Sequence, residues 1–114
     1  KRTSGSYATG IGAFALQNLT TGTFNTALGT FAGGSIQTGT SNTLIGHGAD
    51  VNSPTAVNRI AIGQGAVANS DNSVQLGNSS IGNVYTSGAI NASSFNVTSD
   101  ARLKQKINSI DNAI

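Results

Sequence analysis

The stretch Asn25-Thr26-Ala27-Leu28-Gly29-Thr30-Phe31-Ala32-Gly33 decides the fold, because its pattern returns at nearly fixed spacing along the chain. An aliphatic residue followed by glycine recurs at sequence steps of 17, 17, 17 and 14. The five copies are Ile11-Gly12, Leu28-Gly29, Ile45-Gly46, Ile62-Gly63 and Leu76-Gly77. Three residues after these glycines stand Ala15, Ala32, Ala49, Ala66 and, in the fifth unit, Ser80. Chance does not produce such correlated columns over five units, so the chain is a tandem repeat.

Each unit holds a short β-type run such as Thr43-Leu44-Ile45, then glycine, then a small residue. Units this short cannot hold a pair of helices, so we expect each to be one coil of a parallel β-roll. The residue before glycine is expected in the core, and the glycine in a backbone conformation that other residues resist. A single coil cannot bury its apolar side, so the coils must stack. The predicted structural positions are Gly12, Gly29, Gly46, Gly63 and Gly77.

The composition is poor in large apolar residues. Of 114 residues, 37% are apolar and only 5% aromatic, which is little for the core of a compact globule. Disordered chains usually carry a high net charge, whereas here it is +2. A flexible Gly/Ser/Asn segment and a β-solenoid stabilised by stacking both fit these values, and the repeat favours the solenoid. Because the core is thin, we expect several chains to share it in a homotrimer.

Several functions are disfavoured by the sequence. Apart from Arg59, the basic residues lie near the two ends of the chain, so no basic stripe indicates a nucleic-acid partner. Without cysteine there are no disulfides or thiolate metal sites, and no apolar run approaches the ~20 residues of a membrane span. His47 is the only histidine, and no acid pair is spaced for glycoside hydrolysis. We expect no metal, no cofactor and no membrane insertion, and because Lys1 is not a methionine we expect sequence before it.

The motifs Asn25–Gly33 and Asn58–Ala66 resemble the head repeats of trimeric autotransporter adhesins of the YadA type, and similar repeats occur in phage tail fibres. The resemblance implies a left-handed parallel β-roll and a three-fold trimer for residues 1–83. The period is longer than that of the usual head repeat, so we expect extra loop residues in the first turns. Phe14 and Phe31 share one column. We expect them to pack against neighbouring coils or chains, with an exposed receptor contact as the alternative.

Residues 84–98 break the period but keep β-prone anchors such as Ile90 and Phe95. In tail fibres such a segment winds three chains around one axis, so we expect an intertwined β neck here. Residues 99–114 change character again, because apolar residues recur at steps of 4, 3 and 4. This spacing predicts a short C-terminal α-helix with Asp100 as its N-cap and a seam that favours three strands. The residues of the seam are Leu103, Ile107, Ile110 and Ile114.

The run Ser99-Asp100-Ala101-Arg102-Leu103-Lys104 resembles the opening of the endosialidase-type intramolecular chaperone, which cuts itself from phage fibres after the trimer folds. The resemblance implies cleavage before Ser99, at the Thr98–Ser99 bond. Ser99 would be the nucleophile, Lys104 its base, and Asp100 and Arg102 the positioning residues. A serine needs such a base, and a lysine acts as one only when its pKa is lowered. The alternative is an ordinary helix cap with solvated Arg and Lys side chains.

The function implied is a structural, receptor-binding segment of a trimeric phage tail fibre or tailspike, followed by the start of a self-cleaving trimerisation chaperone. Its place would be the virion, and its partner a glycan or protein on the host cell surface. Chemistry would be limited to single-turnover autoproteolysis in the full-length parent, with no activity on external substrates. The alternative is the head of a bacterial trimeric surface adhesin. The Ser99–Lys104 motif favours the fibre, because an autotransporter would continue into a stalk and a membrane anchor.

Overall fold

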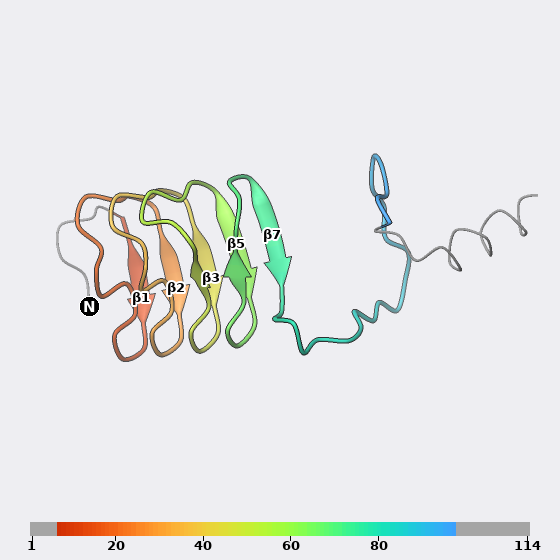
Figure 1. Cartoon of the computed structure of the whole chain (residues 1–114), viewed down its shortest axis with the longest axis horizontal. Coiled ribbons are helices and arrows are strands. Elements are labelled where there is room, and N and C mark those ends of the chain that lie inside the picture. The colour runs from red at the N-terminus through yellow and green to blue at the C-terminus, as the bar shows by residue number, and fades with distance from the viewer. Residues whose placement is uncertain (1–6, 98–114) are drawn as a thin grey trace, which may run out of the picture. The chain divides into compact units, whose positions relative to one another are not determined.

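A computed structural model describes residues 7–97, and this part of the chain is a β-solenoid of about four turns followed by an extended segment. Five parallel strands form the main sheet in the order β1-β2-β3-β5-β7 (Figure 1). A second sheet pairs β4 (Asp50–Val51) with β6 (Val67–Ala68). The main-sheet strands are β1 (Thr9–Ile11), β2 (Thr26–Leu28), β3 (Thr43–Ile45), β5 (Arg59–Ile62) and β7 (Ser73–Leu76). The predicted all-β parallel solenoid is confirmed.

The register of the sheet follows the sequence repeat. Thr26 pairs with Thr9 on one side and with Thr43 on the other, and the last two strands pair Ile60 with Val74. Each of the longer repeat units therefore makes one full coil, and the final unit closes its coil with a shorter stretch of chain. β-branched residues are frequent in the strands, as expected for an extended, half-buried backbone.

Glycines form a column at the C-terminal ends of the strands. Gly12, Gly29, Gly46 and Gly63 have φ between 124° and 133°, a region that side chains rarely adopt. A Cβ on Gly46 would lie 2.7 Å from the carbonyl carbon and oxygen of Gly63 in the next coil. The amide of Gly46 also donates to the carbonyl oxygen of Leu28 at 2.8 Å. At this corner the coils therefore stack backbone against backbone.

The position of the core differs from the expectation. The residue before each repeat glycine points outward, and these side chains are 36–60% exposed: Ile11, Leu28, Ile45, Ile62 and Leu76. The inward positions are the central strand residues Ala27, Leu44 and Ala61, all fully buried. The placement of the residue before glycine in the core is therefore wrong. The physical reason is the close approach of backbones, which favours alanine at many buried positions: Ala15, Ala32, Ala49, Ala56, Ala66 and Ala68. The larger buried side chains outside the main sheet are Leu16, Leu19, Ile36 and Val51.

The chain divides into two compact units after Val84. Residues 84–97 contain no strand, and their apolar side chains, including Ile90 and Phe95, are exposed in the single chain. An intertwined neck made by several chains stays a prediction. The predicted C-terminal helix lies outside the described residues. Within residues 7–97 there is no helix with the length and apolar character to cross a membrane.

Candidate functional site

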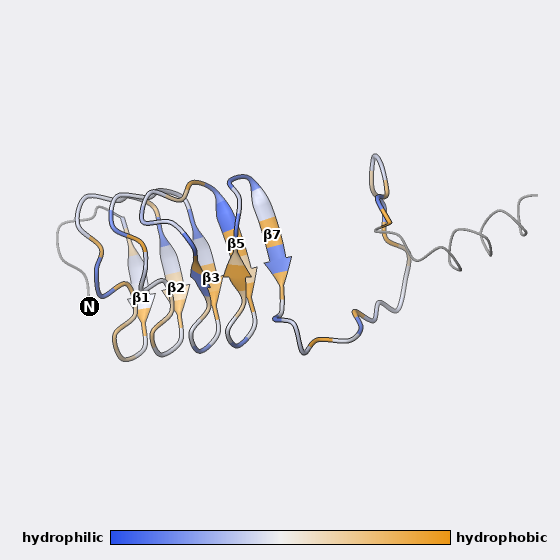
Figure 2. Cartoon of the chain, in the orientation of Figure 1, coloured by the Kyte–Doolittle hydropathy of each residue, from blue (hydrophilic) through white to orange (hydrophobic). Residues whose placement is uncertain are grey.

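One face of the main sheet carries a continuous band of apolar side chains. We call this the outer apolar face, and it comprises Ile11, Leu28, Ile45, Ile62 and Leu76 together with Ile60 and Val74. Apolar colour recurs at the C-terminal ends of successive strands (Figure 2). The band exists because strand residues two apart share a face, and an in-register parallel sheet stacks equal positions at about 4.8 Å. A contiguous exposed apolar surface is a candidate for an interaction site.

Two pairs of aromatic rings stack between the first two coils. Tyr7 lies on Phe24 with ring centroids 5.1 Å apart, and Phe14 lies on Phe31 at 5.0 Å. All four residues have φ between 56° and 62°, an uncommon conformation for aromatic residues that occurs mostly where function or packing maintains it. Phe14 and Phe31 pack against a neighbouring coil, as expected, but remain 57% and 45% exposed. The stacking fits packing between coils, and the exposed area leaves room for the alternative, a receptor contact.

A ladder of buried asparagines runs inside the solenoid just before the main strands. Asn25 and Asn42 are fully buried, and the Nδ2 group of Asn42 donates to Oδ1 of Asn25 at 3.0 Å and to the carbonyl oxygen of Ala56 at 2.8 Å. Oδ1 of Asn42 accepts from the amide of Arg59 at 3.0 Å. Every buried side-chain polar atom in the described residues has such a partner. The ladder therefore satisfies backbone groups that the strands leave unpaired.

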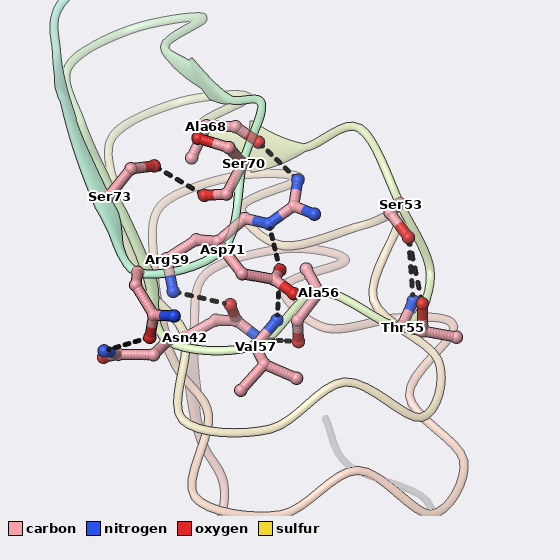
Figure 3. A network of polar contacts seen from close by, with 12 residues as sticks. Asn42, Ser53, Thr55, Ala56, Val57, Arg59, Ala68, Ser70, Asp71 and Ser73 are labelled. Carbon is pink, nitrogen blue, oxygen red and sulfur yellow. Dashed lines mark hydrogen bonds and ion pairs between the residues drawn. The ribbon is translucent and has the colours of Figure 1, made fainter.

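Arg59 ends the ladder where the repeat step shortens from 17 to 14 (Figure 3). Its Nη1 donates to the carbonyl oxygen of Ala68 at 3.0 Å and to Oδ1 of Asn52, and its Nε lies 2.8 Å from Oδ1 of Asp71. The same Asp71 oxygen accepts from the amide of Val57 at 3.0 Å.

The Asp71 carboxylate replaces a backbone carbonyl. One coil earlier, the amide of Thr40, which is the counterpart of Val57, donates to the carbonyl oxygen of Ala56. The side chains of Asp71 and Arg59 thus make the hydrogen bonds that the backbone makes in the longer coils, because the last coil is three residues shorter. The amide of Val57 and the guanidinium of Arg59, both donating to its carboxylate, hold the pKa of Asp71 below its ordinary value.

The other charged group of the solenoid body is also held. Both oxygens of Asp50 accept hydrogen bonds from Ser35, one from its amide and one from its hydroxyl. His47 is exposed, and no group of three His, Cys, Asp or Glu residues in the described part could hold a metal ion. The Asp50 carboxylate thus binds both the amide and the hydroxyl of Ser35 and joins two neighbouring coils.

The predicted site residues fall in two places. The repeat glycines stack at the strand ends, as described above. Thr98, Ser99, Asp100, Arg102 and Lys104 lie outside the described residues, so the autocleavage site stays a prediction.

Three features escaped the sequence interpretation: the outward direction of the aliphatic column, the Tyr7–Phe24 pair and the asparagine ladder. For the last two a signal was present, since Tyr7 and Phe24, like Asn25 and Asn42, are separated by one repeat step. For the aliphatic column no local signal exists, because both sides of the strands are apolar or small.

No protein-family model, curated protein or solved structure matches this chain. The resemblances to adhesin heads and to the fibre chaperone therefore rest on the quoted residues alone.

Proposed function

We propose that this chain is a structural and adhesive segment of a trimeric phage tail fibre or tailspike, located on the virion, that carries a receptor-binding surface for the host cell. In this proposal three left-handed rolls assemble around one axis, residues 84–98 intertwine as a neck, and residues 99–114 begin a self-cleaving chaperone. The observation that carries the proposal is the outer apolar face, which spans all five strands of the main sheet.

A second and third copy of the same chain are the natural occupants of this face. Its seven side chains are aliphatic and carry no charge, so the band has no feature that selects a charged or polar partner. An in-register sheet presents this band along the whole solenoid, and identical copies can pack their bands together around a common axis. The 4-3-4 spacing of Leu103, Ile107, Ile110 and Ile114 is that of a coiled-coil seam, and isoleucine at both kinds of core position favours three copies over two.

The assembly is tested by light scattering of the full 114-residue chain. We expect three times the monomer mass. Ile45→Asp places a charge in the outer apolar face and should yield monomers, because a buried unpaired carboxylate is costly. Thr30→Asp is the matched control, since Thr30 is exposed on the turn after Gly29 and is not one of the residues of the outer apolar face. A wild-type monomer, or a trimer that survives Ile45→Asp, would contradict the proposal.

Self-cleavage separates the fibre from the alternative, the head of a bacterial trimeric surface adhesin, which the repeat motifs equally resemble. In the full-length parent we expect one cut, between Thr98 and Ser99, after assembly. Intact-mass analysis should find the uncut chain in both Ser99→Ala and Lys104→Ala, because the first lacks the nucleophile and the second lacks the base. An uncut wild-type parent would favour the adhesin.

A further inference from the structure

The Phe14–Phe31 stack does not continue into the third coil, and the Phe31 side chain stays 45% exposed. The rings are 5.0 Å apart and within 10° of parallel, so they lie across the direction in which the coils stack. The next two positions of the same column are Gly48 and Gly65. Apart from the two chain neighbours of each glycine, a Cβ at Gly48 would meet nothing within 4 Å, and one at Gly65 would meet only the Asn78 amide nitrogen at 4.0 Å. We call the open space beside the Phe31 ring the Phe31 step.

The size and shape of the Phe31 step fit a small flat ligand. Two coils span about 9–10 Å at the usual strand spacing, which leaves room for one pyranose ring to lie flat against the benzene ring. The face of an aromatic ring carries negative potential and attracts polarised C–H groups. The described residues contain no enclosed cavity, so a ligand here would bind on an open surface.

Few charged side chains lie in this part of the solenoid. Residues 7–83 contain only Asp50, Arg59 and Asp71 as permanently charged residues; Arg59 pairs with Asp71, whereas Asp50 keeps its negative charge and accepts hydrogen bonds from Ser35. The residues directly before Gly48 and Gly65 are His47 and Gln64, which are both exposed. They offer hydrogen-bond donors and acceptors to hydroxyl groups. A ligand with an apolar C–H face, many hydroxyls and no charge matches this combination.

We propose that the Phe31 step is a shallow binding site for a neutral hexose unit of a surface glycan. The sugar stacks on the free face of Phe31 over Gly48, and His47 and Gln64 bind its hydroxyls. This inference rests on the proposed adhesive function and names the class of receptor. The other aromatic pair is less suited, because Phe24 is followed in its column by Ser41 and Asn58, which carry side chains where the Phe14–Phe31 column has glycine.

The test uses saturation-transfer and amide-shift NMR on the full 114-residue chain with the methyl glycosides of glucose, galactose and mannose, and with sialic acid as the charged comparison. We expect at least one neutral sugar to bind weakly and to shift the amides of His47 and Gly48. Sialic acid should bind more weakly than that sugar. Binding of none of the neutral sugars, or shifts confined to other regions, would overturn the proposal.

The matched variants extend or shorten the stack. Gly48→Phe should cover the free ring face, and its φ of 70° is close to the values that Phe14 and Phe31 already adopt. We expect it to lower the sugar affinity about fivefold or more, as should Phe31→Ala. Phe14→Ala keeps the step and should change affinity less than about twofold. Unchanged affinity in Phe31→Ala, which leaves Gly48 untouched, would overturn the proposal even if Gly48→Phe failed to fold.

The same samples separate this inference from the assembly. Oligomeric mass is measured on each sample before titration. A wild-type trimer that attaches to host cells but binds no neutral hexose overturns the Phe31 step alone. A monomer that binds the hexose leaves the step standing and contradicts the trimeric fibre.

Discussion

In a simple globular protein the buried face of a sheet carries the larger apolar side chains. In this main sheet the exposed face carries them. The inward face carries mainly alanine, with Leu44 as its largest strand residue, whereas the outward face carries the aliphatic column. The inner side is sealed by backbone stacking and by satisfied amides, so it needs little apolar volume. The outer side exposes its larger aliphatic side chains in the single chain, and covering them is the role that we propose for further copies. One chain thus closes its own lumen and leaves the aliphatic column of the main sheet exposed.

The largest loss of stability is expected from a substitution in the glycine column, where the backbones of neighbouring coils stack. Gly46→Val places a Cβ against the carbonyl of Gly63 at a φ of 129°. We expect a loss of at least about 3 kcal/mol in the free energy of unfolding, since strain and overpacking add. Gly48→Asn is the control, because its φ of 70° suits asparagine and its surroundings are open. Denaturant titration of both variants measures the difference, and equal midpoints would show that the coils do not stack through these glycines.

Leu44 and Ile45 test the two faces directly, because they are neighbours that point in opposite directions. Leu44→Ala should cost about 2–4 kcal/mol at any protein concentration, since the lumen cannot collapse around the cavity. Ile45→Ala should cost less in the dissociated chain and should make the melting temperature depend more strongly on concentration. Thermal melts over a range of concentrations measure this. If Ile45→Ala shows the larger, concentration-independent loss, the two faces are assigned the wrong way round.

The asparagine ladder should contribute to stability from inside the solenoid. Asn42→Ala removes three hydrogen bonds and leaves the amide of Arg59 buried without its acceptor. We expect a loss of about 2–3 kcal/mol. Asn69→Ala, at an exposed position, should stay within about 0.5 kcal/mol. Urea unfolding decides the point, and similar values for both variants would mean that the ladder contributes nothing beyond surface polarity.

The smallest effect is expected at the short last coil, where Asp71 and Arg59 replace backbone. The folded-state pKa of Asp71 is lowered, so its stabilisation is fully present above the unfolded value of about 3.9 and is lost as pH falls through the lower folded value. Stability should therefore decline less steeply in acid for Asp71→Asn than for the wild type. Melting temperatures from neutral pH down to acid measure this slope. Identical slopes for the two proteins would mean that the Arg59–Asp71 ion pair does not stabilise this coil.

Much of the fold follows from local spacing. The glycine steps of 17 and 14 predict parallel coils, and the register confirms them strand by strand. The aromatic column of Phe14 and Phe31 was also visible from the sequence. The Phe31 step was not, because it depends on ring orientation and on the empty space at Gly48. Similarly, nothing local shows that the Asp71 carboxylate, a whole coil further along the chain, takes the place of a carbonyl as acceptor for the amide of Val57.

The sequence by itself determined the length of each coil, the parallel order and the corners where only glycine fits, since these are properties of repeat spacing and backbone conformation. Tertiary structure alone decided which side of the strands is inside. A run such as Thr-Leu-Ile has an apolar residue on either face, so alternation cannot choose between Leu44 and Ile45. Closure of the coil decides, because the inward positions of the main strands face closely spaced backbones and hold Ala27, Leu44 and Ala61, whereas the larger aliphatic column faces outward.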